Sequence, residues 1–515
     1  MSLFSGQLFT VLRHRRVRIT AAAFGLLIMI LLALFGLWKS VHYIWLAHGE
    51  TIAERQKFDP IMTATWRKLN WCEALNAGPS CPHQQRPWFN PRLPPVNQPP
   101  NFPYEISPVG NNWFTYSALD PGSILPSKSF KWKNGLSITG SHSEPMIAWH
   151  GTLHSHTGWS DGAATPQDAF AFASNQGGLD FLAVTDHPEF WFFNPERTWG
   201  QLKEIAVMAE TPDFVALPGF EYSSPIFGHY IVLGSAGVCS AVKCSTLEDF
   251  YQWLQLPENH EALVAFAHPQ VQRDNATKFE FREMEFIPGL KRQMFGVEVI
   301  HWSGHDRFLF GFSGSQPFID EALAKGWQPG ALGSQDNHGL NWGLPNSRIG
   351  VLAKSLNRSN LMEALRARRF YATSSRDLEL SFDVALPGQP WMQMGSAIAT
   401  ARTSRNIVKS PNKATAVATR LRLFEPDEFN VPRRIEWILD GRIVGRQDFE
   451  GLPNELSNSE GDEKYYGGEI LSSFPESLVR DGRRHYVYVR VYMGEDFATY
   501  AQTSPIIFTP ELTLN

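Results

Sequence analysis

The chain has 515 residues, of which 43% are hydrophobic and 19% are charged, and its formal net charge is −5. This length accommodates two or three domains, and the composition excludes wholesale disorder. The acidic balance, with no extended Lys/Arg run after the N-terminus, argues against a nucleic-acid partner, because phosphate neutralisation supplies most of that affinity.

The N-terminus has the pattern of a signal anchor. Residues 1–18 contain four arginines and no acid, and residues 19–38 carry no charge. A helix over residues 19–38 spans ~30 Å, the thickness of bilayer hydrocarbon. The arginines keep residues 1–18 in the cytoplasm, so we expect a single-pass inner-membrane protein whose remaining residues are periplasmic. A buried soluble helix is the alternative.

Residues 39–145 form the expected extracytoplasmic N-terminal segment. Ten prolines between Pro79 and Pro108 exclude a helix there, and the interleaved aromatic residues suggest an extended strap on the following domain. The four cysteines fall into two close pairs, Cys72 with Cys81 and Cys239 with Cys244. Two disulfides are expected in an oxidising compartment, and four buried thiols are the alternative.

Residues 146–373 alternate short apolar runs with helical segments, which favours parallel strands in an α/β barrel or doubly wound sheet. Thr165, Ser245 or Thr246, and Asn360 are the expected helix starts, with Pro166 at the first helical position after Thr165. The expected strands are Met146–Leu153, Leu179–Thr185, Phe214–Phe220, His229–Leu233, Ala262–Ala267, Phe295–Ile300, Ala331–Gly333 and Arg348–Ala353.

Residues 374–515 have a different pattern, in which apolar and polar residues alternate and turn signals such as Asp440-Gly441 intervene. This pattern predicts an antiparallel β-sandwich with a core separate from that of the preceding domain. The expected strands are Leu378–Val384, Thr419–Phe424, Arg434–Leu439 and His485–Tyr492.

Ten of the 16 histidines lie between His150 and His338, and most of the polar residues of interest directly follow an expected strand. The carboxyl ends of parallel strands lie on one face of a barrel, where active sites form. Imidazoles and carboxylates converging there from five strands predict a metal site. The residues so placed are His154, His156, Asp186, His187, Glu221, His268, Asp336 and His338.

Six motifs over residues 147–373 resemble, in order, those of the PHP (polymerase and histidinol phosphatase) superfamily. RRFYATSS (368–375), IEWILDGRIV (435–444) and the closing YVYVRVYMG…TSPIIF (486–508) resemble a branch related to carbaryl hydrolase-like proteins that carries a C-terminal sandwich. The resemblance implies a distorted (β/α)7 barrel over residues 146–373. The six motifs are HSHTGWSDG (154–162), AVTDHPE (183–189), PGFE (218–221), GHYIVLG (228–234), AHP (267–269) and SQDNH (334–338).

The resemblance also implies a cluster of two or three divalent ions, for which Zn, Mn and Fe all suit the ligands. Glu221, Asp336 and His338 are taken as the catalytic residues. The implied ligands are His154, His156, Glu221 and Asp336 for one ion, Glu221, His229 and His268 for a second, with His301 or His305 as the alternative to His229, and Asp161, His187 and His338 for a third.

The implied reaction is hydrolysis of a phosphomonoester or phosphodiester, small or derived from the envelope, by a hydroxide that bridges two ions. Carboxylic or carbamate ester hydrolysis on the same centre is one alternative, and a non-catalytic metal-binding envelope protein is another. Asp186 is expected to orient an imidazole from the second shell. The candidates for holding a substrate phosphate are Arg273, His305, Arg307, Arg348 and Arg369, with an ordinary structural role as the alternative for each.

Overall fold

The structure is a computed structural model. The expected cytoplasmic segment, membrane anchor, proline-rich strap and Cys72–Cys81 pair lie outside the residues that it describes. No helix within the described residues is long and apolar enough to cross a membrane. The described residues are 117–118, 146–191, 194–224, 227–269, 280–301, 316–400, 416–427, 430–449, 457–460, 463–494 and 499–510.

All eight apolar runs expected before residue 374 form strands, and a further strand, β10 (Phe370–Thr373), follows them. Most residues of these strands are buried, as their apolar composition indicates. The eight strands are β2 (Ile147–Thr152), β3 (Phe181–Val184), β4 (Val215–Ser224), β5 (Gly228–Leu233), β6 (Leu263–Ala267), β7 (Met294–His301), β8 (Gly330–Ser334) and β9 (Arg348–Ala353).

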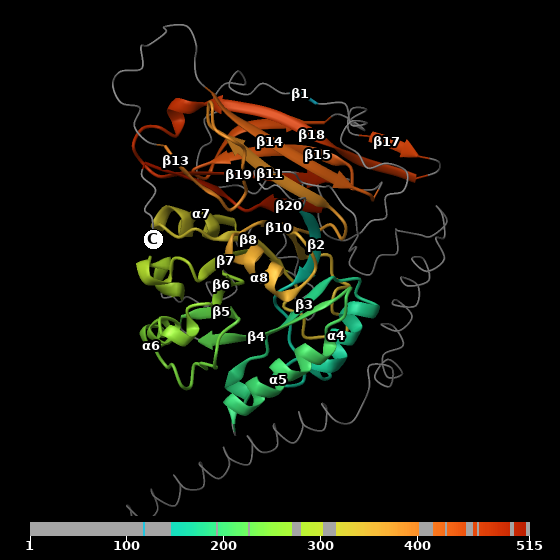
Figure 1. The fold of residues 1–515 in the computed structure, drawn as a ribbon, viewed down its shortest axis with the longest axis vertical. Coiled ribbons are helices and arrows are strands. Elements are labelled where there is room, and N and C mark those ends of the chain that lie inside the picture. The colour runs from blue at the N-terminus through green and yellow to red at the C-terminus, as the bar shows by residue number, and fades with distance from the viewer. Residues whose placement is uncertain are drawn as a thin grey trace, which may run out of the picture.

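These strands form a mixed sheet in the order β10-β9-β2-β3-β4-β5-β6-β7-β8 (Figure 1). β2, β3 and β4 are parallel, and so are β6, β7 and β8. β5 is antiparallel to both β4 and β6, and β9 is antiparallel to β2 and β10, so the expectation of parallel pairing throughout is wrong. The short connection between β4 and β5 cannot make a parallel crossover, which needs a dozen or more residues.

The segments that follow β2 and β8 meet. Ser155 and Asn337 form an isolated parallel bridge, and the His156 amide donates to the Asn337 carbonyl at 2.8 Å. Within the described residues the pairing order nevertheless ends at β8. The structure therefore shows a large mixed sheet, and the strand pairings of the described residues do not show closure of the distorted barrel that the resemblance implies.

Helices pack beside this sheet, with α4 (Pro166–Asn175) and α5 (Pro195–Ala209) next to β3 and β4 (Figure 1). Thr165 and Thr246 cap α4 and α6 (Leu247–Leu254) with capping boxes, as predicted. Asn357, and not Asn360, caps α8 (Arg358–Arg366), because the Asn357 side chain accepts the Asn360 amide. The remaining α-helix of the described residues is α7 (Gln316–Lys325).

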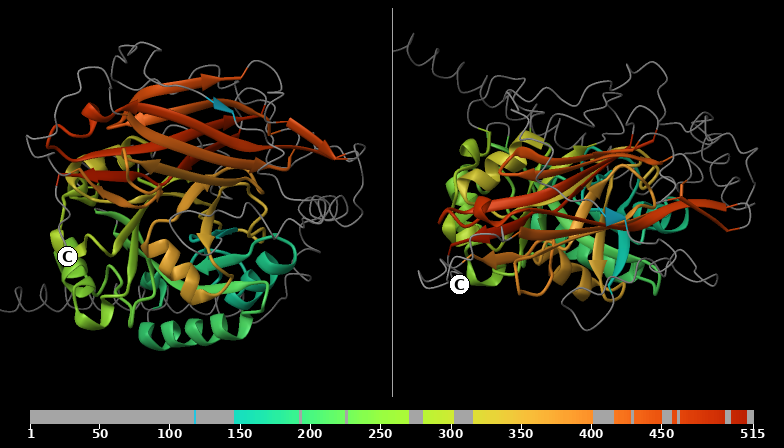
Figure 2. Two further views of the ribbon diagram at one scale, coloured as in Figure 1. Left: turned by 45° about the horizontal axis from the view of Figure 1, so that its top comes forward. Right: turned by 90° about the horizontal axis from the view of Figure 1, so that it is seen from above.

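The C-terminal strands lie above the N-terminal half in Figure 1, and Figure 2 shows them from two further directions. One group, joined by β1 from the segment before residue 146, forms a second sheet in the order β1-β18-β14-β11-β12, with β17 beside β18. The other group continues the large sheet. The strands are β1 (Ser117–Ala118), β11 (Glu379–Ala385), β12 (Met392–Gln393), β13 (Ala397–Ala399), β14 (Ala416–Glu425), β15 (Pro432–Leu439), β16 (Arg442–Asp448), β17 (Ser457–Glu460), β18 (Glu463–Pro475), β19 (His485–Met493), β20 (Thr499–Thr503) and β21 (Ile506–Thr509).

The two halves of the molecule share a sheet and a core. β10 pairs with β20, which makes the large sheet continuous from one half to the other. Ile438 and Tyr488 of the C-terminal half belong to the same hydrophobic cluster as Ile319 of α7 and Val297 of β7. The expectation of separate cores is therefore wrong, although a further cluster that contains Leu380, Leu421 and Val489 joins the two C-terminal sheets.

Candidate metal centre

Nine polar side chains, here called the donor cluster, lie at one edge of the mixed sheet. Most follow the carboxyl ends of β2, β3, β6 and β8, as predicted. Glu221 instead lies inside β4, and His229 is at the start of β5, where the antiparallel pairing puts it opposite Ser223. The donor cluster consists of His154, His156, Asp161, His187, Glu221, His229, His268, Asp336 and His338.

Three groups within the donor cluster have the composition and spacing to hold a metal ion, with ligand atoms within 4.8 Å of one another in each. They agree with the three ligand sets that the resemblance implies, except that His156 joins the third set as well as the first. The first group is His154, His156, Glu221 and Asp336, the second is Glu221, His229 and His268, and the third is His156, Asp161, His187 and His338.

The first group surrounds one point with two imidazole nitrogens and two carboxylate oxygens. Nε2 of His154 lies 3.2 Å from Nε2 of His156, 3.3 Å from Oε2 of Glu221 and 3.1 Å from Oδ1 of Asp336. Nε2 of His156 lies 3.2 Å from the same Glu221 oxygen and 2.9 Å from the same Asp336 oxygen. Tetrahedral zinc ligands at 2.0–2.1 Å from the metal are roughly 3.3 Å apart, so the spacing fits a cation.

Glu221 connects the first group to the second. Its Oε1 lies 2.9 Å from Nδ1 of His229 and 3.0 Å from Nε2 of His268, while its Oε2 faces the first group. The Glu221 side chain is 1% exposed, and neither its Oε2 nor Oδ1 of Asp336 accepts a hydrogen bond. Buried carboxylate oxygens are satisfied by donors or by cations, so these two atoms support the fit to a metal.

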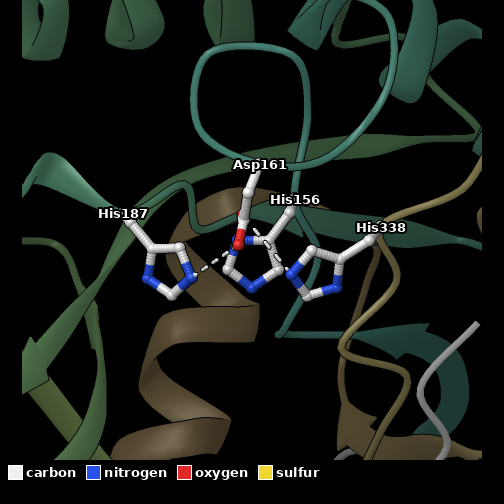
Figure 3. Close-up of side chains that lie close together, drawn as sticks. All are labelled: His156, Asp161, His187 and His338. Atoms are coloured by element: carbon white, nitrogen blue, oxygen red, sulfur yellow. Dashed lines mark ion pairs between the residues drawn. The ribbon is translucent and has the colours of Figure 1, made fainter. Parts of the chain in front are cut away.

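The third group is centred on Asp161, whose carboxylate lies between the rings of His187 and His338 (Figure 3). The distances are 3.6 Å from Oδ2 to Nε2 of His187 and 3.4 Å from Oδ1 to Nε2 of His338. Nδ1 of His156 lies 3.7 Å from Asp161 Oδ1, so the two ring nitrogens of His156 face different groups. Asp161 is 37% exposed, which makes the third group the most open of the three.

The carboxylates and imidazoles of the cluster shift one another's pKa values. Burial opposes ionisation of Glu221, but His154, His229 and His187 outweigh it and hold its pKa well below the usual range. Burial likewise opposes the charge on His154, but Asp336, Glu221 and Glu298 raise its pKa well above the usual value. Protonated imidazoles therefore balance the charge of the carboxylates when no cation is bound, and metal binding must displace the imidazole protons.

Asp186 does not contact an imidazole directly, which corrects its expected role. It accepts the amide and hydroxyl of Thr157 at 2.7 and 2.6 Å, and the hydroxyl of Ser160 at 2.5 Å. The Ser160 oxygen lies 3.4 Å from Nδ1 of His156. Asp186 therefore fixes the loop that carries His156 and Asp161, and it acts on His156 through Ser160.

The two candidate phosphate-binding arginines in the described residues donate hydrogen bonds to partners outside the donor cluster. Arg348 is fully buried at the start of β9 and donates to the carbonyls of Gly343 and Arg376. Arg369 pairs with Glu363 of α8 and donates to the Leu352 carbonyl. Both have the structural role that was the alternative for them. The remaining candidates, Arg273, His305 and Arg307, lie outside the described residues.

Two residues of β7 that contact the cluster were not assigned these roles from the sequence. Glu298 accepts from Nδ1 of His154 at 2.8 Å, and Nε2 of His301 lies 3.2 Å from Oδ2 of Asp336. His301 had been named only as an alternative to His229, which occupies its expected position. A single acid inside the apolar run FGVEVI was the available signal, because a buried carboxylate requires partners.

Comparison of the sequence with known protein families finds no match, and comparison with curated proteins finds none. Among solved structures, a two-domain protein from Bacteroides vulgatus containing a predicted PHP-like metal-dependent phosphoesterase is 15% identical, with a TM-score of 0.35 over 70% of this chain and 95% of that one. PsfC from Pseudomonas syringae is 15% identical, with a TM-score of 0.29 over 42% of this chain and 87% of that one. These similarities are too low to carry a functional argument.

Proposed function

We propose that the protein is a metal-dependent hydrolase that cleaves phosphate esters. The observation that carries the proposal is the position of Glu221, whose two oxygens face two different donor groups. A carboxylate shared in this way is suited to hold two cations side by side. Bound there, divalent ions supply a water-derived nucleophile at neutral pH and polarise the scissile group.

The charge of the cluster supports a phosphate ester as the substrate. Its only acidic members are Asp161, Glu221 and Asp336. With Glu298, which contacts His154, these residues carry four negative charges, so three divalent ions would leave the loaded centre positive and would favour an anionic substrate over a neutral ester.

The test measures turnover by the full-length, metal-replete protein on p-nitrophenyl phosphate, bis(p-nitrophenyl) phosphate and p-nitrophenyl acetate, with added Mn or Zn. Glu221→Ala should abolish phosphoester hydrolysis, because both groups lose a ligand. Glu436→Gln is the matched control, since Glu436 is a fully buried glutamate on β15 that bonds Tyr492 and lies outside the donor cluster. A chelator should remove the activity reversibly.

Other outcomes of the same panel favour the other functions. Turnover of the carboxylic ester alone, in a manner that needs Glu221, would assign the protein to carboxylic or carbamate ester hydrolysis. Metal binding without turnover of any ester would favour a non-catalytic envelope protein. Phosphoesterase activity that survives Glu221→Ala unchanged would refute the assignment of this centre.

We also propose that the donor cluster lies on the outer side of the cytoplasmic membrane, with residues 19–38 as the anchor. The disulfide between Cys239 and Cys244, whose Cα atoms are 5.9 Å apart, supports this location, because such bonds persist in oxidising compartments. A reporter that is active only in the cytoplasm, fused after Asn515, should be silent. Reporter activity would place the catalytic residues inside the cell.

A further inference from the structure

The strand β7 lies between β6 and β8, both of which lead into the donor cluster, yet no residue of β7 belongs to the three donor groups. We propose that β7 is the positioning strand of the metal centre. In this proposal Glu298 fixes His154 and His268, and His301 fixes Asp336. The inference rests on the metal centre of the proposed function and does not depend on which ester is cleaved.

Glu298 is fully buried, and each of its oxygens accepts from a different ligand residue. Oε1 accepts from Nδ1 of His154 at 2.8 Å, and Oε2 accepts from the backbone amide of His268 at 2.6 Å. The first bond keeps the proton of His154 on Nδ1 and leaves Nε2, which faces the first donor group, available to a cation. One carboxylate thus orients a ligand of the first group and a ligand of the second.

The bond to His268 has a conformational role as well. His268 has a φ of +25°, which is unusual for a residue with a side chain. The amide that Glu298 accepts is the amide of this residue. Glu298 therefore stabilises the backbone conformation that turns the His268 ring toward Glu221, where its Nε2 lies 3.0 Å from Oε1.

The hydrogen bond of His301 acts on the first group, and its ring also contacts the ring of His268, with 5.3 Å between the centroids. Its Nε2 lies 3.2 Å from Oδ2 of Asp336, and Oδ1 of the same carboxylate faces His154 and His156. Asp336 also has a positive φ, +43°, so its orientation is not one that the backbone favours by itself. A donor on Oδ2 selects the rotation in which Oδ1 points to the cation position.

A β-bulge explains how one strand presents both residues to the cluster. Residues 298 and 301 are three apart and would face opposite sides of a regular strand. The register of β7 against β8 shifts between Glu298 and Ile300. Val299 and Ile300 consequently pack in the same hydrophobic cluster, and His301 returns to the side of Glu298. Bulges that redirect a side chain in this way are frequent beside active sites.

The proposal predicts different losses for the two residues. In Glu298→Gln the amide retains one acceptor oxygen, and its NH2 group faces the other donor, so either His154 or His268 loses its partner. We expect metal affinity at the first or the second group to fall roughly 10–100-fold, as for other residues that orient metal ligands. Loss at the third group is not expected, because none of the described contacts of Glu298 or His301 reaches Asp161, His187 or His338.

The measurement is a stepwise titration of chelator-treated, full-length protein with Zn or Co(II), followed by metal content and by the Co(II) absorption spectrum. Glu298→Gln should weaken up to two ions and change their spectrum, while Glu436→Gln should match the wild type. Native affinity for every ion in Glu298→Gln would overturn the role of Glu298. Because the readout is metal binding, a wild type that binds ions but cleaves no ester would end the proposed function and leave this inference standing.

His301 provides the second, independent variant in case Glu298→Gln does not fold. His301→Leu removes the donor to Asp336 and should weaken one ion, that of the first group. His301→Gln retains an N–H donor and should recover most of the affinity, which a purely structural role in packing does not predict. Equal affinity in His301→Leu and the wild type, or equal loss in both variants, would contradict the positioning role.

Discussion

The donor cluster and a second polar cluster, formed between α7 and the C-terminal strands, differ in the groups that contact their carboxylates. In the second cluster the Tyr488 hydroxyl donates to both oxygens of Asp320 at 3.2 Å, and the Tyr492 hydroxyl donates to Glu436 at 3.2 Å. The members of this tyrosine–arginine cluster are Asp320, Glu436, Tyr486, Tyr488, Arg490, Tyr492, Tyr500 and Gln502.

The groups that surround the carboxylates in the two clusters indicate which cluster requires a cation. Tyrosine hydroxyls donate to both oxygens of Asp320 and to Oε2 of Glu436, although Oε1 of Glu436 accepts no hydrogen bond. Burial raises the pKa of Glu436 despite the field of Arg490. Imidazoles instead bring nitrogen lone pairs, and the pKa of Glu221 is lowered although burial opposes this. Within the described residues, the three groups that could hold a metal all lie in the donor cluster.

The largest expected effect is stabilisation of the folded protein by metal, which tests this contrast between the two clusters. A ligand at 100 times its dissociation constant stabilises the folded state by about 2.7 kcal/mol for each site. Zn or Mn should therefore raise the Tm of the chelator-treated wild type and of Glu436→Gln. In Glu221→Gln most of the increase should disappear, because the first and second groups share that carboxylate. An equal rise in Glu221→Gln would show that the metal binds elsewhere.

A smaller effect on stability is expected from removal of the disulfide between Cys239 and Cys244, which lies beside the donor cluster. The Cys244 carbonyl accepts the hydroxyl of Tyr222, the neighbour of Glu221, and the Ala241 amide donates to Glu189. Closing a loop of this length stabilises a protein by about 2 kcal/mol through the unfolded chain.

The test is the double substitution Cys239→Ser with Cys244→Ser, compared with the wild type with and without reductant. If the bond acts on the unfolded chain, the loss of stability should be the same in metal-free and metal-loaded protein. A loss confined to the metal-loaded form would show instead that the disulfide holds the donor cluster itself.

Much of the strand framework could be predicted because its strands are short apolar runs bounded by turn residues. The antiparallel direction of β5 was also present in the sequence, since too few residues separate Glu221 from His229 for a crossover. The cap of α8 was misplaced because Asn357 and Asn360 are both suitable capping residues, and only the backbone decides between them.

Seven members of the donor cluster were predicted because they stand in short motifs at expected strand ends, whereas Asp161 and His229 were expected only from the family resemblance. Glu298 and His301 were missed in their present role because neither stands in such a motif, and a bulge directs both to the same side. For Arg348 and Arg369 the sequence left both roles open, because a charged side chain near a strand end binds carbonyls or helix carboxylates as readily as substrate.

The smallest expected effect is a pH-dependent change in stability caused by Asp320. It tests whether the tyrosine–arginine cluster is stable without a bound cation. Burial raises the pKa of this half-buried aspartate to about 6, against the opposing influence of Arg490 and the hydrogen bond from Tyr488. A carboxyl group with a raised folded-state pKa contributes stability at pH values below its ordinary pKa, near 4, and loses that contribution as the pH rises through about 6.

Asp320→Asn keeps this position neutral at every pH. Its stability relative to the wild type should be unchanged at pH 4 and higher by about 1–2 kcal/mol at pH 7.5, because one pKa unit corresponds to about 1.4 kcal/mol and the group is partly solvated. Thermal unfolding at the two pH values measures the difference, and Asp213→Asn, at an exposed carboxylate, is the control. Destabilisation at pH 7.5 would mean that the charge of Asp320 is needed to balance Arg490, so that the tyrosine hydroxyls alone do not satisfy this cluster.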